Sequence, residues 1–176
     1  MTMRARGFSL IELVIAIVVL SIIAAMGAPL LANGLQFFNA ATTDLDTLSK
    51  ERYATERMVR ELRAIRFNAG TNQYDVTLGG AGATSISFTK VDGVTVTIDG
   101  ATLPDLNINY SGGGAVLLTN QLASVAFTGY AVDGVTTTTD PATMAYVDVA
   151  LSLARSPTNS FPRVARVQLR NQDPTP

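Results

Sequence analysis

The chain has 176 residues, of which 47% are hydrophobic and 15% are charged, and its formal net charge is −1. It contains neither cysteine nor histidine, which excludes disulfides, thiolate metal sites, cysteine nucleophiles and the commonest metal ligand and general base. Between Glu12 and Asp44, 31 consecutive residues carry no formal charge. The length suits one domain, or one small domain with an appendage.

The N-terminal segment combines a basic flank with an apolar run that is long enough to cross a membrane. Arg4 and Arg6 precede the run, and the positive-inside rule keeps such a flank in the cytoplasm. Residues 13–32 are uncharged and mostly aliphatic, and a membrane-spanning helix needs roughly 20 such residues. Residues 24–28 imitate the cleavage site of a secretory signal, so removal there is an alternative to a plain membrane anchor.

Glu12 lies at the start of the apolar run, where a carboxylate needs a partner. Placing a charged side chain inside a membrane costs on the order of 2.5–3.5 kcal/mol on insertion scales. Such residues usually pair with another group or line a pathway for ions or substrates. A cut after Gly7 would give Phe8 a new α-ammonium one helical turn from Glu12. The charge of Glu12 would then suit the positive end of the helix dipole, although a straight helix holds i and i+4 side chains closer than it holds a free terminus. The alternative is a neighbouring subunit, shifted along its axis, that brings its own ammonium to Glu12. Glu12 would then be an assembly determinant.

The segment Arg4-Ala-Arg-Gly7 followed by Phe8-Ser-Leu-Ile-Glu12-Leu resembles the type III signal of type IV prepilins and type II secretion pseudopilins. The resemblance implies cleavage between Gly7 and Phe8 by a cytoplasm-facing prepilin peptidase, N-methylation of Phe8, and pairing of Glu12 with an adjacent subunit's N-terminus. It also implies a single-pass protein of the bacterial inner membrane, with its head outside the cytoplasm. The implied partners are membrane lipid, the inner-membrane assembly platform and other pilin or pseudopilin subunits.

Gly27 and Pro29 predict a kink or a loosened turn near Ala25. Proline lacks the amide donor and clashes with the carbonyl four residues back, and glycine adds conformational freedom. The alternative is an ordinary membrane proline that water or neighbouring helices tolerate. Pro29 also falls where the first helix of the resembled family carries a proline.

We expect one helix from about Phe8 to Phe67, because apolar residues keep helical spacing as far as Ile65. Its parts would be a leader at 1–7, a transmembrane or filament-core segment at 8–32 and an amphipathic continuation at 33–67.

Arginines crowd the last turns of the expected helix, with Glu56 and Arg60 in the favourable i,i+4 order. Tyr53 is the one aromatic residue interleaved with them for base stacking, and the whole chain is acidic, which disfavours nucleic acid as a partner. A solvated, salt-bridged face that packs its other side on a sheet is the favoured interpretation. A third possibility is that these arginines meet acidic surfaces of partner subunits.

Residues 68–176 predict a β-rich head, because the hydrophobic period becomes alternating. Asp92-Gly93 predicts a hairpin, and Asp99-Gly100 and Asp133-Gly134 predict further turns. The expected strands are 74–78, 85–90, 94–98, 106–110, 115–119, 123–132, 145–155 and 163–170. The resulting fold class is α+β, a pilin fold with the outer half of a long helix packed on an antiparallel sheet.

The head offers no convergent catalytic groups, so we expect no enzyme, no cofactor and no metal site. Its aspartates mostly occupy turn positions, although a calcium site at the loop flanked by Asp133 and Asp140 is an open alternative. Membrane-anchored catalysis is the rival class, and it would need a constellation of reactive side chains in residues 71–176.

Residues 56–63 resemble the corresponding segment of larger minor pilins. So does the tail, a long strand that ends in Ala-Leu-Ser-Leu, followed by a loop and by Val-Gln-Leu-Arg170-Asn171. The classes resembled are J-type pseudopilins and mannose-sensitive-haemagglutinin-type pilins. Many major pilins close a C-terminal loop with a cysteine pair, which this chain lacks. The expected function is therefore a minor pilin or pseudopilin that helps initiate or cap a type IV pilus or a type II secretion pseudopilus. The alternatives are a major pilin, or a tip module that binds DNA or a surface ligand.

Overall fold

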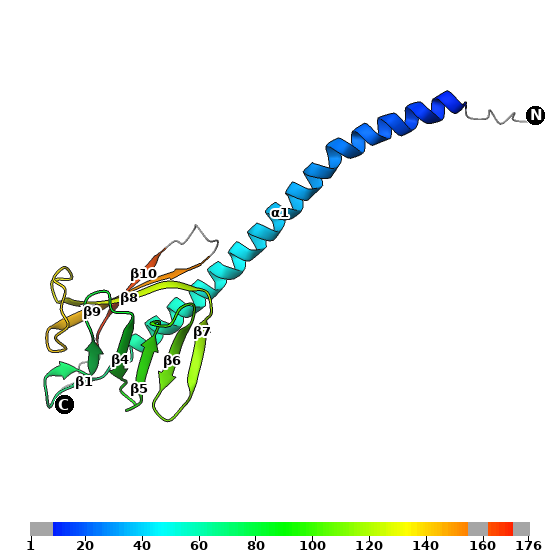
Figure 1. Cartoon of the computed structure of the whole chain (residues 1–176). Helices are drawn as coiled ribbons and strands as arrows, with labels where there is room; N and C mark the ends of the chain where they lie inside the picture. Colours follow the sequence, from blue (N-terminus) through cyan, green and yellow to red (C-terminus); the bar gives the residue numbers. More distant parts are fainter. Residues whose placement is uncertain (1–8, 155–161, 171–176) are drawn as a thin grey trace, which may run out of the picture. The chain divides into compact units, whose positions relative to one another are not determined.

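The structure is a computed structural model that describes residues 9–154 and 162–170 (Figure 1). Gly7 and Phe8, where maturation is predicted, lie outside the described residues. The chain divides into two compact units, Met1–Thr43 and Asp44–Pro176. One long helix is followed by antiparallel β-sheets, which confirms the predicted α+β, pilin-like architecture.

Helix α1 runs from Leu10 to Leu62. Ser9 precedes it, and the Ser9 carbonyl oxygen accepts hydrogen bonds from the amides of Glu12 at 3.1 Å and Leu13 at 3.2 Å. Ser9 therefore occupies the N-cap position, where serine is among the preferred residues. Ser9 and Glu12 also have the sequence spacing of a capping box.

Helix α1 ends five residues before the predicted Phe67. The amide of Ile65 donates to the carbonyl three residues back at 3.2 Å, a bond typical of a tightened last turn. The amide of Arg66 then donates to the carbonyl of Thr89 at 2.9 Å, and β1 follows at Phe67–Asn68. The prediction of a helix to Phe67 was wrong because the Arg66 amide bonds to the sheet and Phe67 belongs to β1.

A five-stranded antiparallel sheet follows the chain order β3-β4-β5-β6-β7. Its strands are β3 (Val76–Leu78), β4 (Ser85–Thr89), β5 (Thr95–Asp99), β6 (Leu106–Tyr110) and β7 (Ala115–Thr119). The predicted hairpin at Asp92 and Gly93 joins β4 to β5. Gly93 has a φ of 83°, which favours glycine, and Asp92 Oδ1 accepts the amide of Val94 at 3.0 Å.

A three-stranded antiparallel sheet has the order β10-β9-β8, with β10 at one edge. Its strands are β8 (Leu122–Ala131), β9 (Met144–Leu153) and β10 (Arg163–Gln168). These bounds lie within two residues of the predicted ones in the described part of the chain. The predicted strand end at Arg155 lies outside the described residues.

The predicted strand 74–78 is divided at Asp75. Residues Gln73–Tyr74 form β2, which pairs with β1, whereas β3 pairs with β4. The Asp75 amide donates to the carbonyl of Arg66 and the Asp75 carbonyl accepts from the amide of Thr89, both at 2.9 Å. The chain thus changes its pairing partner at this residue, which splits one apolar run into two strands.

The hydrophobic core joins the outer part of α1 to both sheets. On β9, one alternating face is at most 2% exposed. That face and the buried face of α1 belong to a single cluster, which includes Ala54, Met58, Leu62, Val147, Val149, Leu151 and Leu153. Val167 and Leu169 extend the same cluster near the last strand. The predicted packing of this alternating face on the helix is confirmed.

Candidate assembly site and charged clusters

Glu12 lies in the first turn of α1 and is exposed. An acidic side chain at this place favours the positive end of the helix dipole. Leu10 is 82% exposed and Ile11 67% exposed. In the chain as described, Glu12 is therefore a carboxylate surrounded along the helix by uncovered apolar side chains, and it is available to a partner group.

The apolar side chains of α1 between Leu10 and Phe38 are uncovered. In the most apolar window of the helix no residue is buried, and the helix is long and apolar enough to cross a membrane. Ser21 and Thr42 donate their hydroxyls to carbonyls four residues back, at 2.7 and 2.8 Å, and Thr43 does the same at 2.9 Å. Satisfying hydroxyls within the helix removes the cost of exposing them to an apolar medium.

Gly27 and Pro29 lie inside α1, which is helical on both sides of them. Pro29 cannot donate to the carbonyl of Ala25, so this carbonyl loses its usual helical partner. A Cβ added at Gly27 would meet no heavy atom within 4 Å, which shows that the glycine is not required by packing in this chain. The predicted kink stays a prediction.

The outer part of α1 is tied to the sheets through Tyr110 on β6. The Tyr110 hydroxyl accepts from Arg57 Nη2 at 2.6 Å and donates to Glu61 Oε1 at 3.0 Å. Arg57 also forms an ion pair with Glu61 at 3.2 Å, and Lys90 Nζ lies 3.7 Å from the same carboxylate. The Glu61 side chain, 9% exposed, thus has three partners, one each from α1, β6 and the β4–β5 hairpin turn, as a buried charge requires.

The electrostatics of this cluster favour the charged forms of its cations. The pKa of Arg57 is raised mainly by its hydrogen bond to Tyr110, and the pKa of Lys90 is raised mainly by its hydrogen bond to Asp92. Lys90 Nζ lies 3.0 Å from Asp92 Oδ2, so the β4–β5 hairpin joins the same network. The solvated side of the helix carries a different pair, because the exposed Glu56 binds Arg52 at 2.7 Å rather than Arg60.

A second cluster is built around Arg166 on β10. Its guanidinium binds both carboxylate oxygens of Asp148 on β9, at 2.7 and 2.8 Å, and donates to the carbonyl of Gly134 at 3.0 Å. The guanidinium carbon lies 4.6 Å from the ring centre of Tyr130 on β8. Arg166 therefore links three strands and the 133–134 turn. The bidentate geometry is the strong form of a charge-assisted pair.

The turn aspartates use their carboxylates on nearby backbone amides. Asp133 Oδ1 accepts from the amides of Val135 and Thr136, and its Oδ2 accepts from the Thr136 hydroxyl at 2.5 Å. These bonds, led by the Thr136 hydroxyl, lower the pKa of Asp133. Asp140 Oδ1 accepts the amide of Ala142 at 3.0 Å. The predicted turn chemistry therefore accounts for both carboxylates that the calcium alternative invoked.

Within residues 9–154 and 162–170, no group of three or more histidine, cysteine, aspartate or glutamate side chains could hold a metal ion.

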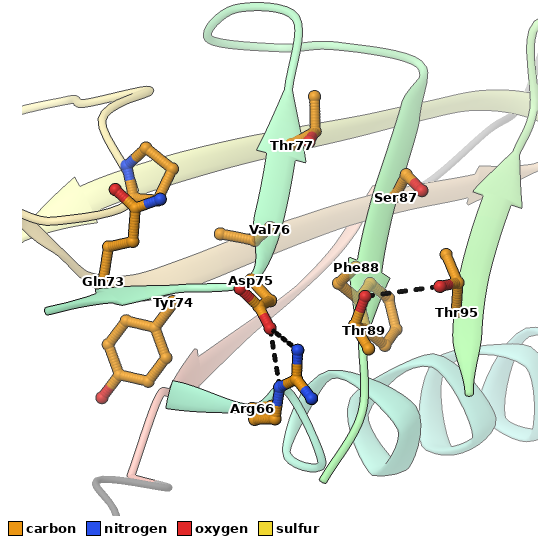
Figure 2. A pocket seen from close by; sticks show the side chains of 11 residues that line it. Arg66, Gln73, Tyr74, Asp75, Val76, Thr77, Ser87, Phe88, Thr89 and Thr95 are labelled. Carbon is orange, nitrogen blue, oxygen red and sulfur yellow. Dashed lines mark hydrogen bonds and ion pairs between the residues drawn. The ribbon is translucent and has the colours of Figure 1, made fainter. Parts of the chain in front are cut away.

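A hollow of about 460 Å³ lies at the junction of β2, β3, β4 and β5. Figure 2 shows the side chains that line it. Arg66 and Asp75 form an ion pair in it, with Arg66 Nε 2.7 Å from Asp75 Oδ2, and Thr89 and Thr95 pair their hydroxyls at 3.3 Å. The two charges neutralise one another. None of the residues that line this hollow is an activated nucleophile paired with a base.

Residues 2–28 match the family model described as the prokaryotic N-terminal methylation motif. This motif is the signal of prepilins and pseudopilins, so it supports a substrate of prepilin peptidase that is methylated at its new N-terminus. No curated protein matches the chain. With the exposed apolar helix, the motif supports a membrane-anchored, type IV pilin-like or pseudopilin-like structural subunit.

Proposed function

We propose that this chain is a minor pilin or pseudopilin that helps initiate or cap a type IV pilus or a type II secretion pseudopilus. The N-terminal methylation motif over residues 2–28 is the observation that carries the proposal. The uncovered apolar length of α1 supports it, because such a helix needs either lipid or other subunits around it. The subunit waits in the inner membrane as a single-pass protein, with its head outside the cytoplasm.

In this proposal, prepilin peptidase cuts between Gly7 and Phe8, and Phe8 is N-methylated. Glu12 then pairs with the N-terminal ammonium of an adjacent subunit, which offsets the cost of a carboxylate in lipid or in the filament core. Its position in the first turn and its exposure leave it open to that partner. Gly27 and Pro29 loosen the helix when the subunit moves from the bilayer into the filament.

Mass spectrometry of the chain purified from its native membrane tests maturation. The expected product begins at Phe8 and carries one methyl group on its α-nitrogen. A product that begins at Met1, or one trimmed beyond Ala25, would contradict the proposal. Substitution of Gly7 by a bulky residue should leave the leader attached, while Ala5→Val serves as a control in the same flank.

Incorporation into filaments tests the role of Glu12. Glu12→Leu should be inserted into the membrane and matured as the native chain is, but its incorporation into sheared filaments should fall strongly. Ser9→Ala, a change of the adjacent cap residue, is the matched control. Incorporation of Glu12→Leu at the native level would contradict the pairing.

The minor role and its alternatives are separated by stoichiometry and by deletion. A subunit that initiates or caps should be scarce in purified filaments, yet its deletion should lower the number of filaments. A subunit that makes up most of the filament mass would be a major pilin. DNA binding by a tip module would appear as a gel shift that weakens steeply between low and high salt.

A further inference from the structure

A groove lined by five arginines runs between α1 and β10. It consists of two hollows, of about 550 and 510 Å³, that share Arg63. The first hollow is also lined by Arg60 and Arg163, and the second by Arg166 and Arg170. We call this surface the α1–β10 groove. All of these residues belong to the unit Asp44–Pro176.

The charge of the α1–β10 groove is strongly positive. Glu56 is the carboxylate that lines the first hollow, and it is already engaged by Arg52 at 2.7 Å. Asp148 compensates Arg166 from β9. Arg163 and Arg170 are exposed, and each has a neighbour. Arg170 Nε donates to Gln168 Oε1 at 3.0 Å, and the pKa of Glu56 is lowered mainly by its hydrogen bond to Arg52 and in part by the charge of Arg163. An excess of exposed guanidinium groups in a concave surface favours a partner that brings carboxylates or other anions.

The backbone of β10 shows which form that partner takes. The amide of Leu169 donates to the carbonyl of Ala145, and this sets the alternation along the antiparallel pair. Val167 and Ala165 then bond to β9, whereas the backbone groups of Val164, Arg166 and Gln168 point away from it. In the described residues β10 pairs with β9 alone. An unpaired edge of this kind is a template for another strand.

The groove also has apolar surface beside its charges. Val164 is 62% exposed, and Val59 on α1 is partly buried against the core. Both line the first hollow. A bound strand could therefore alternate acidic residues with apolar ones, because successive side chains of a strand point to opposite faces.

We propose that the α1–β10 groove binds an extended acidic segment of a partner protein, which adds as a strand to the free edge of β10 and pairs its carboxylates with the groove arginines. A peptide matches the edge because its own amides and carbonyls complete the ladder. Nucleic acid fits less well, because none of the described residues that line the two hollows offers an aromatic ring for stacking. This contact goes beyond the proposed function, since assembly through the apolar part of α1 does not require it.

The test measures binding of fluorescent peptides to the full-length chain in detergent by anisotropy. The probe is a short peptide that alternates glutamate with valine. One comparison peptide alternates lysine with valine, and another keeps the acidic sequence but has N-methylated amides that cannot form a ladder. A labelled DNA duplex is the fourth probe. The inference expects the first peptide alone to bind tightly.

Two pairs of variants locate the contact. Gln168→Pro removes one outward-facing amide while leaving the β9 ladder intact, and Gln168→Ala keeps that amide. Arg163→Glu reverses a groove charge, and Lys50→Glu reverses a charge on α1 outside the groove. Gln168→Pro and Arg163→Glu should each weaken binding of the acidic peptide by on the order of tenfold, as expected for the loss of a charge-assisted or ladder hydrogen bond. Lys50→Glu should stay within about twofold of the native chain. Gln168→Ala is the reference for Gln168→Pro, because both variants lose the side chain that accepts from Arg170. Circular dichroism confirms that each variant is folded.

The inference is overturned by an acidic peptide that does not bind, by equal binding of the N-methylated peptide, or by equal affinities of Gln168→Pro and Gln168→Ala. Tighter binding of the DNA duplex than of the peptide, with the same dependence on Arg163, would instead make the groove a nucleic-acid site. None of these results bears on cleavage at Gly7 or on incorporation through Glu12, so failure here is distinct from failure of the proposed function.

Discussion

Replacing Tyr110 by phenylalanine tests whether the network between α1 and the sheet stabilises the head. The substitution removes one hydroxyl, which accepts from Arg57 at 2.6 Å and donates to Glu61 at 3.0 Å. Hydrogen bonds to charged groups contribute about 1.5–3 kcal/mol each. Arg57 and Glu61 remain in direct contact at 3.2 Å, so they partly satisfy one another after the change. We therefore expect a loss of about 2 kcal/mol in the free energy of unfolding rather than the sum of two bonds.

Calorimetry of the full-length chain in detergent measures this loss as a shift of Tm. For a unit the size of Asp44–Pro176, 1 kcal/mol corresponds to about 4 °C, so Tyr110→Phe should lower Tm by about 8 °C. Tyr53→Phe on the same helix is the matched control, because Tyr53 is 59% exposed, and its Tm should change by about 2 °C or less.

A double-mutant cycle separates the network from simple truncation. Groups in contact should show a coupling of about 0.5–3 kcal/mol between Tyr110→Phe and Glu61→Gln. If the two changes add without coupling, or if Tyr110→Phe behaves like its control, the reasoning from this cluster fails.

Three further predictions concern the strands and turns of the head. Gly129→Ala should lower the free energy of unfolding by about 1–3 kcal/mol, because a Cβ there overlaps the backbone carbonyl of Thr138. Gly79→Ala is the control, because a Cβ at Gly79 meets no heavy atom within 4 Å, and thermal melts compare the two variants. Asp133 has a lowered pKa, so its contribution to stability is present above the ordinary aspartate pKa of about 4 and is lost as the pH falls through the folded-state value. The Tm difference between the native chain and Asp133→Asn should accordingly shrink in acid, and a constant difference would contradict this assignment. Asp148→Asn leaves Arg166 on β10 without a bidentate carboxylate partner, so the Tm of the variant should lie below that of the native chain. Salt on the order of 1 M should reduce this Tm difference, because it screens the charge pair in the native chain.

Local sequence patterns predicted most of the strands, because alternation and turn chemistry act over few residues. The β4–β5 hairpin formed where Asp92 and Gly93 indicated it, and β6 and β7 have the predicted bounds. A hydrophobic pattern within one strand or helix could not reveal where the chain changes the strand with which it pairs. The split at Asp75 and the early end of α1 at Leu62 both depend on backbone bonds to β4, which is distant in sequence.

The charged clusters escaped prediction for a related reason. Tyr110 is 49 residues from Glu61 and 53 from Arg57, so no helical or strand spacing connects them. Arg166 and Asp148 become direct cross-strand partners only once the register of β9 and β10 is known. The N-terminal signal could be predicted, because all of its residues lie in one short segment and no contact with a distant part of the chain is needed to identify it. The family match over residues 2–28 reflects this local character.

The apolar area of α1 does not by itself decide between storage in a membrane and assembly into a filament. In water, covering its exposed leucines, isoleucines and valines would stabilise association at roughly 25 cal/mol per Å². In a bilayer those side chains already contact hydrocarbon, which is as apolar as another helix, so association gains little from the hydrophobic effect. Glu12 is different, because a carboxylate in lipid costs on the order of 2.5–3.5 kcal/mol and a cationic partner recovers that cost. Under the proposed function, the free energy that favours assembly therefore comes from the pairing of Glu12 and from contacts of the head. The apolar part of α1 is compatible with both the bilayer and the filament core.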